Sequence, residues 1–585
     1  MMHVTSITIE APVHDHLIIH FFVALSPSMA SQPISYTDAR NPTFNEVGGD
    51  QVNMVFGKYV LLAGVTLRLT TGVITLTGGQ DSLDKLKPVV MDASRRTGCL
   101  QGTRRDVLKF IVDWVHNPHG QQNILWLHGL AGSGKSALST TIASILSSSG
   151  QLGAFLFFDR DVTDRSDPTV VIRTLAHQLG SSSPRIGATL RAVVEGNSNI
   201  LASSIHLQFQ KLLLDPLSSI GNLTAPIVIV LDALDECGTA DERETLLEVL
   251  ANDFKNLPYH VRIIITSRLD IGICNAFESQ YHILPFELDI TSSANSDDIL
   301  SFFRYRMSLI RNKKRHMRLE TGWPGEDVLH TLVQRASGLF VWASTASGFI
   351  NAHDPKRRLD VVLRGDVASG AEGALDALYK TALESIGLWD DEDFISDFRA
   401  IIGIILVARQ PLSSSAIDAL LLLPEHRPSM HTISLLRCVL QQDRTVRVLH
   451  PSFADFLMTQ ERCGRDFWSF DRYTYHRYLA MRCMDCMDAV LKRNMCNMTL
   501  TVDQANEKLP EEVSYSCLFW IDHICVIEDG SPVMDRLRDF LYQHLLHWFE
   551  AMSILKRSRY MIPLLDELRD WISVSQSRVV GHPVV

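Results

Sequence analysis

Residues 129–136 read Gly-Leu-Ala-Gly-Ser-Gly-Lys-Ser and fit the phosphate-binding pattern G-x-x-x-x-G-K-[ST]. Such a loop binds phosphate because its glycines let backbone N–H groups turn inward, and the following helix adds its positive dipole end. We expect Lys135 to neutralise the β- and γ-phosphates and the Ser136 hydroxyl to bind Mg²⁺. The predicted phosphate-binding set is Gly129, Gly132, Ser133, Gly134, Lys135, Ser136 and Ala137.

The segments around this loop have the order that phosphate binding requires. Residues 123–128 (Asn-Ile-Leu-Trp-Leu-His) are mostly apolar and predict a buried strand, whereas residues 137–146 predict a helix. Strand, loop and helix together would place the phosphates at a helix N-terminus. The alternative is a glycine-rich turn without a ligand, and the flanking pattern argues against it.

A second candidate site follows another apolar run. Residues 227–231 are all aliphatic, as in a central parallel strand that is buried on both faces. Asp232 comes next, at the strand's carboxyl end, where ligands bind in open α/β sheets. We expect Asp232 to hold Mg²⁺ through water, and Asp235 or Glu236 to orient an attacking water. The alternatives are a helix N-cap for Asp232 and a solvated turn for the other two carboxylates.

A third apolar run, residues 261–266, is followed by Ser267 and Arg268. A polar residue and an arginine at this strand end fit a γ-phosphate sensor, so Arg268 joins the two carboxylates as a predicted catalytic residue. A surface arginine at the sheet edge is the alternative. Residues 267–270 are also faintly similar to the N-K-x-D guanine motif of GTPases, but arginine replaces its lysine, which favours adenine over guanine.

These segments resemble the NACHT class of signal-transduction (STAND) P-loop NTPases, nephrocystin type. The most similar detail is the small Ala233 between the Mg²⁺ aspartate and the acidic pair. Upstream, residues 99–104 resemble the G-T-R segment of fungal members, which implies that Thr103 and Arg104 help to enclose the base. Downstream, residues 336–343 resemble the G-L-F-[IV]-W-A helix of the same group. There Phe340 stands where related plant and animal switches have a proline.

The resemblance extends to a predicted winged helix. Residues 413–423 predict an apolar helix, and residues 435–440 and 445–449 predict two short strands around a turn. The next segment, 449–457, is similar to the fungal motif H-x-S-F-x-D-F-L, in the place of the M-H-D motif of related switches. The resemblance implies that His450 contacts the β-phosphate of ADP and holds a closed state. A purely structural histidine is the alternative.

Composition favours a cytoplasmic, multidomain protein. The 585 residues carry a net charge of −11, which argues against a general nucleic-acid surface, and the 10 cysteines are scattered as in reduced proteins. We find no signal peptide and no apolar run that predicts a membrane span. The basic run 311–318 predicts a solvated helix end rather than a nuclear signal. Zinc binding by Cys483 and Cys486 with His476 and Cys463 is a weaker alternative to a plain helix face.

The expected fold is an α/β P-loop NTPase, with a parallel sheet and flanking helices, followed by a helical domain, a winged-helix domain and a helical C-terminal region. The predicted boundaries are 1–95 for an irregular N-terminal region without a recognised effector, with strands near 59–78; 96–286 for the NACHT domain; 287–385 for the helical domain; 386–465 for the winged helix; and 466–585 for the C-terminal helices. No period of repeat length occurs, so we expect no WD, ankyrin or TPR array in this chain.

The resemblance implies an ATP/ADP-binding switch with Mg²⁺ as cofactor, in which nucleotide exchange is coupled to homo-oligomerisation. It also implies slow ATP hydrolysis, an unidentified protein partner, and a role in fungal innate immunity or self/non-self recognition. Two other classes stay open at this point. One is a constitutive P-loop NTP hydrolase whose turnover is the output; the other is a scaffold that binds nucleotide only for stability. Nucleotide-dependent assembly distinguishes the switch, and high turnover without a partner distinguishes the hydrolase.

Overall fold

The computed structural model describes residues 82–94, 96–117, 120–197, 199–221, 225–365, 370–493, 509–528 and 531–580, together with short strands between residues 3 and 68. These strands form two antiparallel sheets, ordered β1-β2-β3 and β4-β5-β6. Their bounds are β1 His3–Ile9, β2 Ile19–Ala24, β3 Ile34–Tyr36, β4 Val52–Met54, β5 Tyr59–Leu62 and β6 Val65–Arg68. The rest of the predicted N-terminal region before residue 82 lies outside the described residues.

A parallel sheet of five strands, ordered β11-β7-β10-β9-β8, organises the region predicted to bind nucleotide, called the nucleotide-binding region below. All its carboxyl ends therefore meet at one edge. The strands are β7 Ile124–His128, β8 Leu152–Phe157, β9 Ile227–Asp232, β10 Val261–Ser267 and β11 Ile283–Glu287. The three apolar runs singled out in the sequence are β7, β9 and β10, so these strand predictions are confirmed. Pro285 in β11 is tolerated because β11 is an edge strand.

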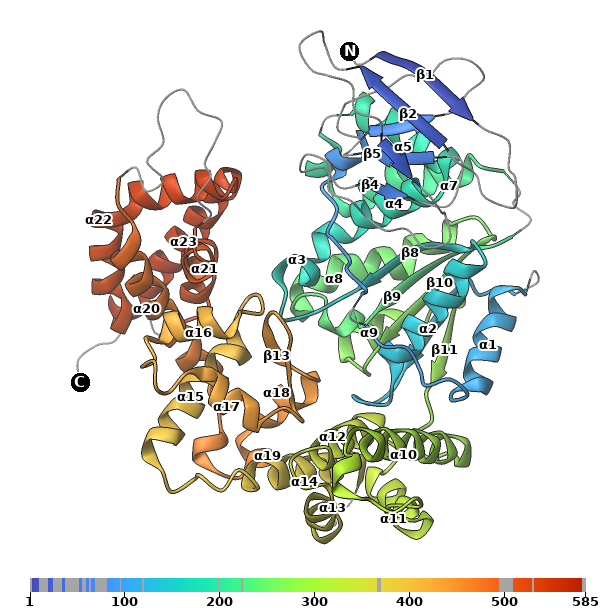
Figure 1. Ribbon diagram of the computed structural model, residues 1–585. Helices are drawn as coiled ribbons and strands as arrows, with labels where there is room; N and C mark the ends of the chain where they lie inside the picture. Colours follow the sequence, from blue (N-terminus) through green and yellow to red (C-terminus); the bar gives the residue numbers. More distant parts are fainter. Residues whose placement is uncertain are drawn as a thin grey trace.

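Helices cover both faces of this sheet because its central strands carry apolar residues on both sides (Figure 1). Leu125 of β7 and Val230 of β9 pack on one side with α1 (Arg105–Val115) and α2 (Lys135–Ser148). Their strand neighbours Trp126 and Leu231 face the other side. That side is covered by α4 (Val171–Ser182), α5 (Pro184–Gly196) and α8 (Ala240–Glu248), among others.

The chain beyond the sheet is mostly helical and shares one continuous hydrophobic core. Figure 1 shows α10–α14 beneath the sheet, and α15–α18 with the strand pair β12–β13 beside it. The bounds are α10 Ser293–Lys313, α11 Glu326–Ala336, α12 Phe340–Ile350, α13 Pro355–Arg364, α14 Gly370–Glu384, α15 Glu392–Val407, α16 Ser414–Leu421, α17 Ser429–Leu435, β12 Leu440–Gln442, β13 Val446–Val448, α18 Pro451–Leu457, α19 Gln460–Cys463, α20 Arg472–Val490, α21 Glu511–Cys525, α22 Ser531–Ile554 and α23 Met561–Val580. Among the described helices, none is both long and apolar enough to span a membrane.

One sequence-based expectation for this region was wrong in detail. The strand predicted over 435–440 begins only at Leu440, because residues 429–435 form α17 instead. Within the helical domain expected over 287–385, α11 and α12 are separated at Ser337 and Gly338, which have φ values of 46° and 81°. The break lets the start of α12 turn toward the phosphate-binding loop.

Gly338→Ala tests whether this break needs glycine. A Cβ at this position would lie 2.2 Å from the Ile290 carbonyl oxygen, and the positive φ disfavours any L side chain. We expect the free energy of unfolding to fall by at least about 2 kcal/mol. Gly322→Ala is the matched control, since a Cβ there would meet no described atom within 4 Å. Equal urea midpoints for the two variants would contradict the expectation.

Candidate nucleotide-binding site

A cavity of about 650 Å³ lies at the carboxyl edge of the sheet, a volume that suits a nucleotide-sized ligand. Parts of the chain that are far apart in sequence line it: the residues before α1, the phosphate-binding loop, three strand ends, the start of α12 and the segment leading into α18. The structure brings most of the predicted site residues together here, namely Thr103, Arg104, Gly132, Gly134, Lys135, Ser136, Ala137, Asp232, Asp235, Glu236, Arg268 and His450. Gly129 and Ser133 belong to the same loop but do not line the cavity.

The loop conformation depends on glycine and on contact with α12. Gly132 has a φ of 80°, and a Cβ there would lie 2.1 Å from Cγ1 of Val341. The backbone N–H of Val341 donates to the Gly132 carbonyl oxygen at 3.1 Å, so the start of α12 is joined directly to the loop. Gly134, with a φ of 99°, precedes the first turn of α2. The loop backbone forms a cradle beside the N-terminus of α2, and together they fit a phosphate group.

Lys135 points back into the loop. Its Nζ donates to the carbonyl oxygens of Gly129 at 2.7 Å and Leu130 at 2.9 Å. Burial lowers the pKa of Lys135 to about 8, although the nearby Asp235 carboxylate partly opposes this effect. An anion placed in the cradle would restore the pKa toward its ordinary value, so the lysine is suited to recognise phosphate.

The carboxylate predicted to hold a metal is fully buried at the end of β9. Asp232 Oδ1 accepts a hydrogen bond from Thr266 Oγ1 at 2.6 Å, and Oδ2 pairs with the guanidinium of Arg96. Ser136, in the first turn of α2, lines the same cavity and offers a hydroxyl. Hydroxyl and carboxylate oxygens are the ligands that Mg²⁺ prefers, so Ser136 and Asp232 fit that ion.

The acidic pair after β9 is held by two arginines. Asp235 accepts from the Arg268 backbone N–H at 3.0 Å, and its other oxygen lies 3.3 Å from Arg268 Nε. Glu236 lies 3.9 Å from Arg160 in the loop after β8. Burial raises the pKa of Glu236 to about 8, because the effect of burial exceeds the opposing effect of Arg160. A carboxyl that is protonated at neutral pH is a poor base, so this arrangement does not favour water activation by Glu236.

Arg104, one of the two residues predicted to enclose a base, stacks on the ring of Phe340. The Arg104 guanidinium lies 4.8 Å from the ring centroid of Phe340, and its Nη2 donates to the Ser133 carbonyl oxygen at 2.7 Å. Thr103 Oγ1 donates to the Leu100 carbonyl oxygen at 2.7 Å. The proline position of related switches is therefore taken by a ring that stacks on Arg104. A flat apolar surface of this kind suits a nucleobase.

His450 lies beside the phosphate-binding loop, far from it in sequence. Its Cε1 is 3.8 Å from the Cβ position that a side chain at Gly132 would occupy. Its Nδ1 accepts from the Ser452 backbone N–H at 3.2 Å, so the neutral ring carries its proton on Nε2. Burial lowers the pKa of His450 to about 3, and Arg268 and Lys135 add to this effect. The imidazole is thus a neutral N–H donor at the cavity.

Asp455 of α18 is a site residue whose role sequence reasoning missed. One oxygen accepts from Arg268 Nη1 at 2.8 Å and the other from Arg160 Nη1 at 3.1 Å. Burial alone would raise the pKa of Asp455, but the two arginines hold it below its ordinary value. The aspartate in the motif H-x-S-F-x-D-F-L was the available signal. Its partner Arg160 belongs to no motif and was not predictable.

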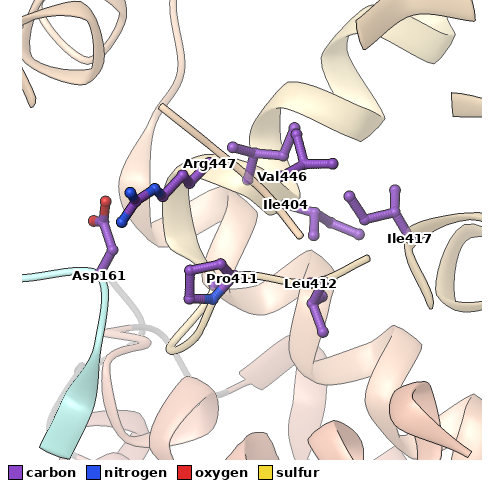
Figure 2. A pocket seen from close by; sticks show the side chains of 9 residues that line it. Asp161, Ile404, Pro411, Leu412, Ile417, Val446 and Arg447 are labelled. Atoms are coloured by element: carbon purple, nitrogen blue, oxygen red, sulfur yellow. The ribbon is translucent and has the colours of Figure 1, made fainter. Parts of the chain in front are cut away.

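The nucleotide-binding region also contacts the helical part of the chain at residues outside α18. The Arg409 carbonyl oxygen accepts from the Thr163 backbone N–H at 3.2 Å. Figure 2 shows Asp161 of the nucleotide-binding region facing Arg447 of β13, beside a small apolar cavity. Burial raises the pKa of Asp161 to about 7. The interface thus places several charged side chains close to the candidate site.

The cysteine alternative finds no support in the part of the chain that the structure describes. There, no group of three or more His, Cys, Asp or Glu side chains is arranged to hold a metal ion. Cys483 is buried in α20, and His476 Nδ1 instead shares a hydrogen bond with His523 Nδ1 at 2.8 Å. These residues belong to the core between α20 and α21.

Comparison with known proteins agrees with this site. A family model described as Nephrocystin 3, N-terminal, matches residues 103–268, the span from the segment predicted to enclose a base to Arg268. The vegetative incompatibility protein HET-E-1 of Podospora anserina is 25% identical over 472 residues, which cover 74% of this chain and 33% of HET-E-1. The chain therefore spans about a third of that relative.

Two solved structures align more loosely. Cdc6p of Pyrobaculum aerophilum is 14% identical with a TM-score of 0.26, covering 62% of this chain and 94% of that one. Orc1 of Aeropyrum pernix, solved in complex with DNA, is 15% identical with a TM-score of 0.27, covering 66% of this chain and 96% of that one. At these TM-scores neither structure supports an inference. The family match over residues 103–268 and the similarity to HET-E-1 agree with the resemblance drawn from the motifs, which is to nephrocystin-type NACHT P-loop NTPases.

Proposed function

We propose that this protein is a nucleotide-operated switch that binds ATP and ADP with Mg²⁺ and changes its assembly when one replaces the other. The predicted winged helix, residues 386–465, would dock on the nucleotide-binding domain in the ADP-bound form and leave it in the ATP-bound form. By similarity to a vegetative incompatibility protein, the output would belong to self/non-self recognition.

The observation that carries this proposal is the contact of Arg268 with two carboxylates from different regions. Arg268 pairs with Asp235, which follows β9 in the chain, and with Asp455 on α18. It also lines the cavity. As the predicted γ-phosphate sensor, Arg268 would exchange Asp455 for a γ-phosphate oxygen. ADP has no such group and would leave the Arg268–Asp455 pair in place. This gives the two nucleotides a differential affinity for the docked form, which a switch requires.

His450 would add a second contact that depends on docking. Its Nε2–H can donate to a β-phosphate in the cradle formed at Gly132, and the bond between Ser452 and Nδ1 fixes the tautomer needed for this. The same geometry argues against the constitutive hydrolase. Asp235 is tied to Arg268 and Glu236 has a raised pKa, so water activation would be slow while α18 is docked.

Lys135→Ala tests nucleotide binding itself. A charge-assisted phosphate contact contributes about 1.5–3 kcal/mol, so we expect at least about tenfold weaker binding of a fluorescent ADP at neutral pH. Phosphate favours the protonated lysine, whose pKa is about 8 in the free protein. Affinity of the parent should therefore fall as pH rises above about 8, and this fall should be absent in the variant.

The control for this measurement is Lys109→Ala, on the exposed side of α1 and outside the cavity. It should bind like the parent at every pH. Parent-like affinity of Lys135→Ala would overturn the assignment of the phosphate site.

Asp455→Asn tests the switch. The variant keeps the size of the side chain and removes the charge that holds Arg268 and Arg160. Each partly exposed ion pair contributes about 0.2–1 kcal/mol, so losing both should shift the docked-to-undocked ratio by roughly two- to thirtyfold. We expect the purified variant to retain less ADP and to self-associate more readily, as measured by nucleotide extraction and light scattering.

Asp376→Asn is the matched control, because Asp376 forms a close ion pair with Arg462 within the helical part of the chain. It should retain ADP and assemble like the parent. If Asp455→Asn behaves like this control, the contact on α18 does not govern the nucleotide state.

A further inference from the structure

The chain that leads into α1 brings an arginine into the candidate site. At its start, Leu83 and Leu86 are buried against α4 and α5. Near its end, the backbone N–H of Cys99 donates to Thr141 Oγ1 of α2 at 2.8 Å. Arg96 lies between these two anchors, and its side chain lines the cavity. We call residues 87–94 and 96–99 the approach segment.

Arg96 lies between the two elements that supply the predicted Mg²⁺ ligands. Its Nη2 pairs with Asp232 Oδ2 at the end of β9. Its Nε donates to Thr140 Oγ1 at 3.2 Å, and that hydroxyl donates to the Ser136 carbonyl oxygen at 2.7 Å. The guanidinium therefore bridges Asp232 and the first turn of α2, where Ser136 and Asp232 would hold the ion.

The surroundings of Asp232 leave one of its carboxylate oxygens for a cation. Asp232 is fully buried, and its Oδ1 already accepts from Thr266, so Oδ2 is the oxygen left for a cation. A buried carboxylate needs a cationic partner, which can be a guanidinium or a metal ion. Arg96 is held over the ring of Phe157 at 4.5 Å from its centroid, which keeps its charge close to Asp232.

We propose that Arg96 is a tethered competitor of Mg²⁺ for Asp232, and that binding of a Mg²⁺-nucleotide releases the approach segment from α2. This rests on the proposed nucleotide binding. Nucleotide without metal leaves the Arg96–Asp232 pair in place. The Mg²⁺ complex of the nucleotide displaces Arg96 from Asp232.

Arg96→Gln tests the competition through the Mg²⁺ dependence of binding rather than through turnover. We expect the Mg²⁺ concentration at half-maximal binding of fluorescent ADP to fall by roughly tenfold, since no ion pair has to be broken. Arg165→Gln is the matched control: Arg165 lies over the same Phe157 ring, at 5.1 Å, and pairs with Asp159 instead of Asp232. Its Mg²⁺ midpoint should match that of the parent.

A different result would assign Arg96 another role. If Arg96 contacts phosphate, Arg96→Gln binds ADP more weakly both in Mg²⁺ and in EDTA, which would overturn the proposal. An unchanged Mg²⁺ midpoint with intact ADP binding would overturn it as well and would leave the proposed function standing. A parent protein that binds no nucleotide in either condition would refute both.

Hydrogen exchange of the unmodified protein tests the release without any substitution. The amides of Arg96 and Cys99 donate to Ala93 and Thr141, so peptides that contain them should be protected in the free protein and with ADP in EDTA. With ADP and Mg²⁺ these peptides should exchange faster, while peptides from α4 stay unchanged. Equal protection of the approach segment in the two ADP samples would contradict the proposal.

Discussion

The structure of the candidate nucleotide-binding site depends on carboxylates and arginines that neutralise one another around its cavity. Asp232, Asp235 and Asp455 are each held by an arginine, and each arginine also lies where a phosphate or a metal ion would bind. Because the side chains of Asp232 and Asp235 are buried, an unpaired charge on either would be costly. A ligand that binds one of these arginines therefore leaves the carboxylate that the arginine had neutralised without its cationic partner.

This constraint joins the cavity to the docking of α18. Asp455 pairs with Arg160 and Arg268 of the nucleotide-binding region. In the proposed switch, these two ion pairs would stabilise the docked position of α18. In the proposed switch, Arg268 is both the predicted γ-phosphate sensor and a contact of α18. Nucleotide exchange could therefore affect the docking of α18 without a chain of intermediate residues. Neighbouring backbone contacts, such as Thr163 with Arg409, do not depend on charge and would be lost only after α18 leaves.

Much of the nucleotide-binding region was predictable from the sequence. The loop at 129–136 and the aliphatic runs before Asp232 and Ser267 identify a parallel sheet and its ligand edge, because buried parallel strands require such runs. Both edge strands, β8 and β11, were missed. In β11, the proline and the alternating burial give a weak pattern. The winged-helix assignment and the domain boundaries remain predictions.

The ion pairs of the site were harder to foresee. Arg96 and Arg160 belong to no motif, and their partners become visible only when segments distant in sequence meet at the sheet edge. Arg268 was predicted as a phosphate sensor, but its contact with Asp455 follows from the position of α18 and not from local sequence. Charged side chains take their partners from tertiary structure, and a sequence pattern reports only their type.

The most direct test of the account is the nucleotide content and the mass of the purified protein, before and after exchange into ATP with Mg²⁺. The account predicts bound ADP and a small species at first, followed by a larger assembly once ATP has replaced ADP. A protein whose mass is the same with ADP and with ATP, or that carries no nucleotide and takes up none, would contradict it.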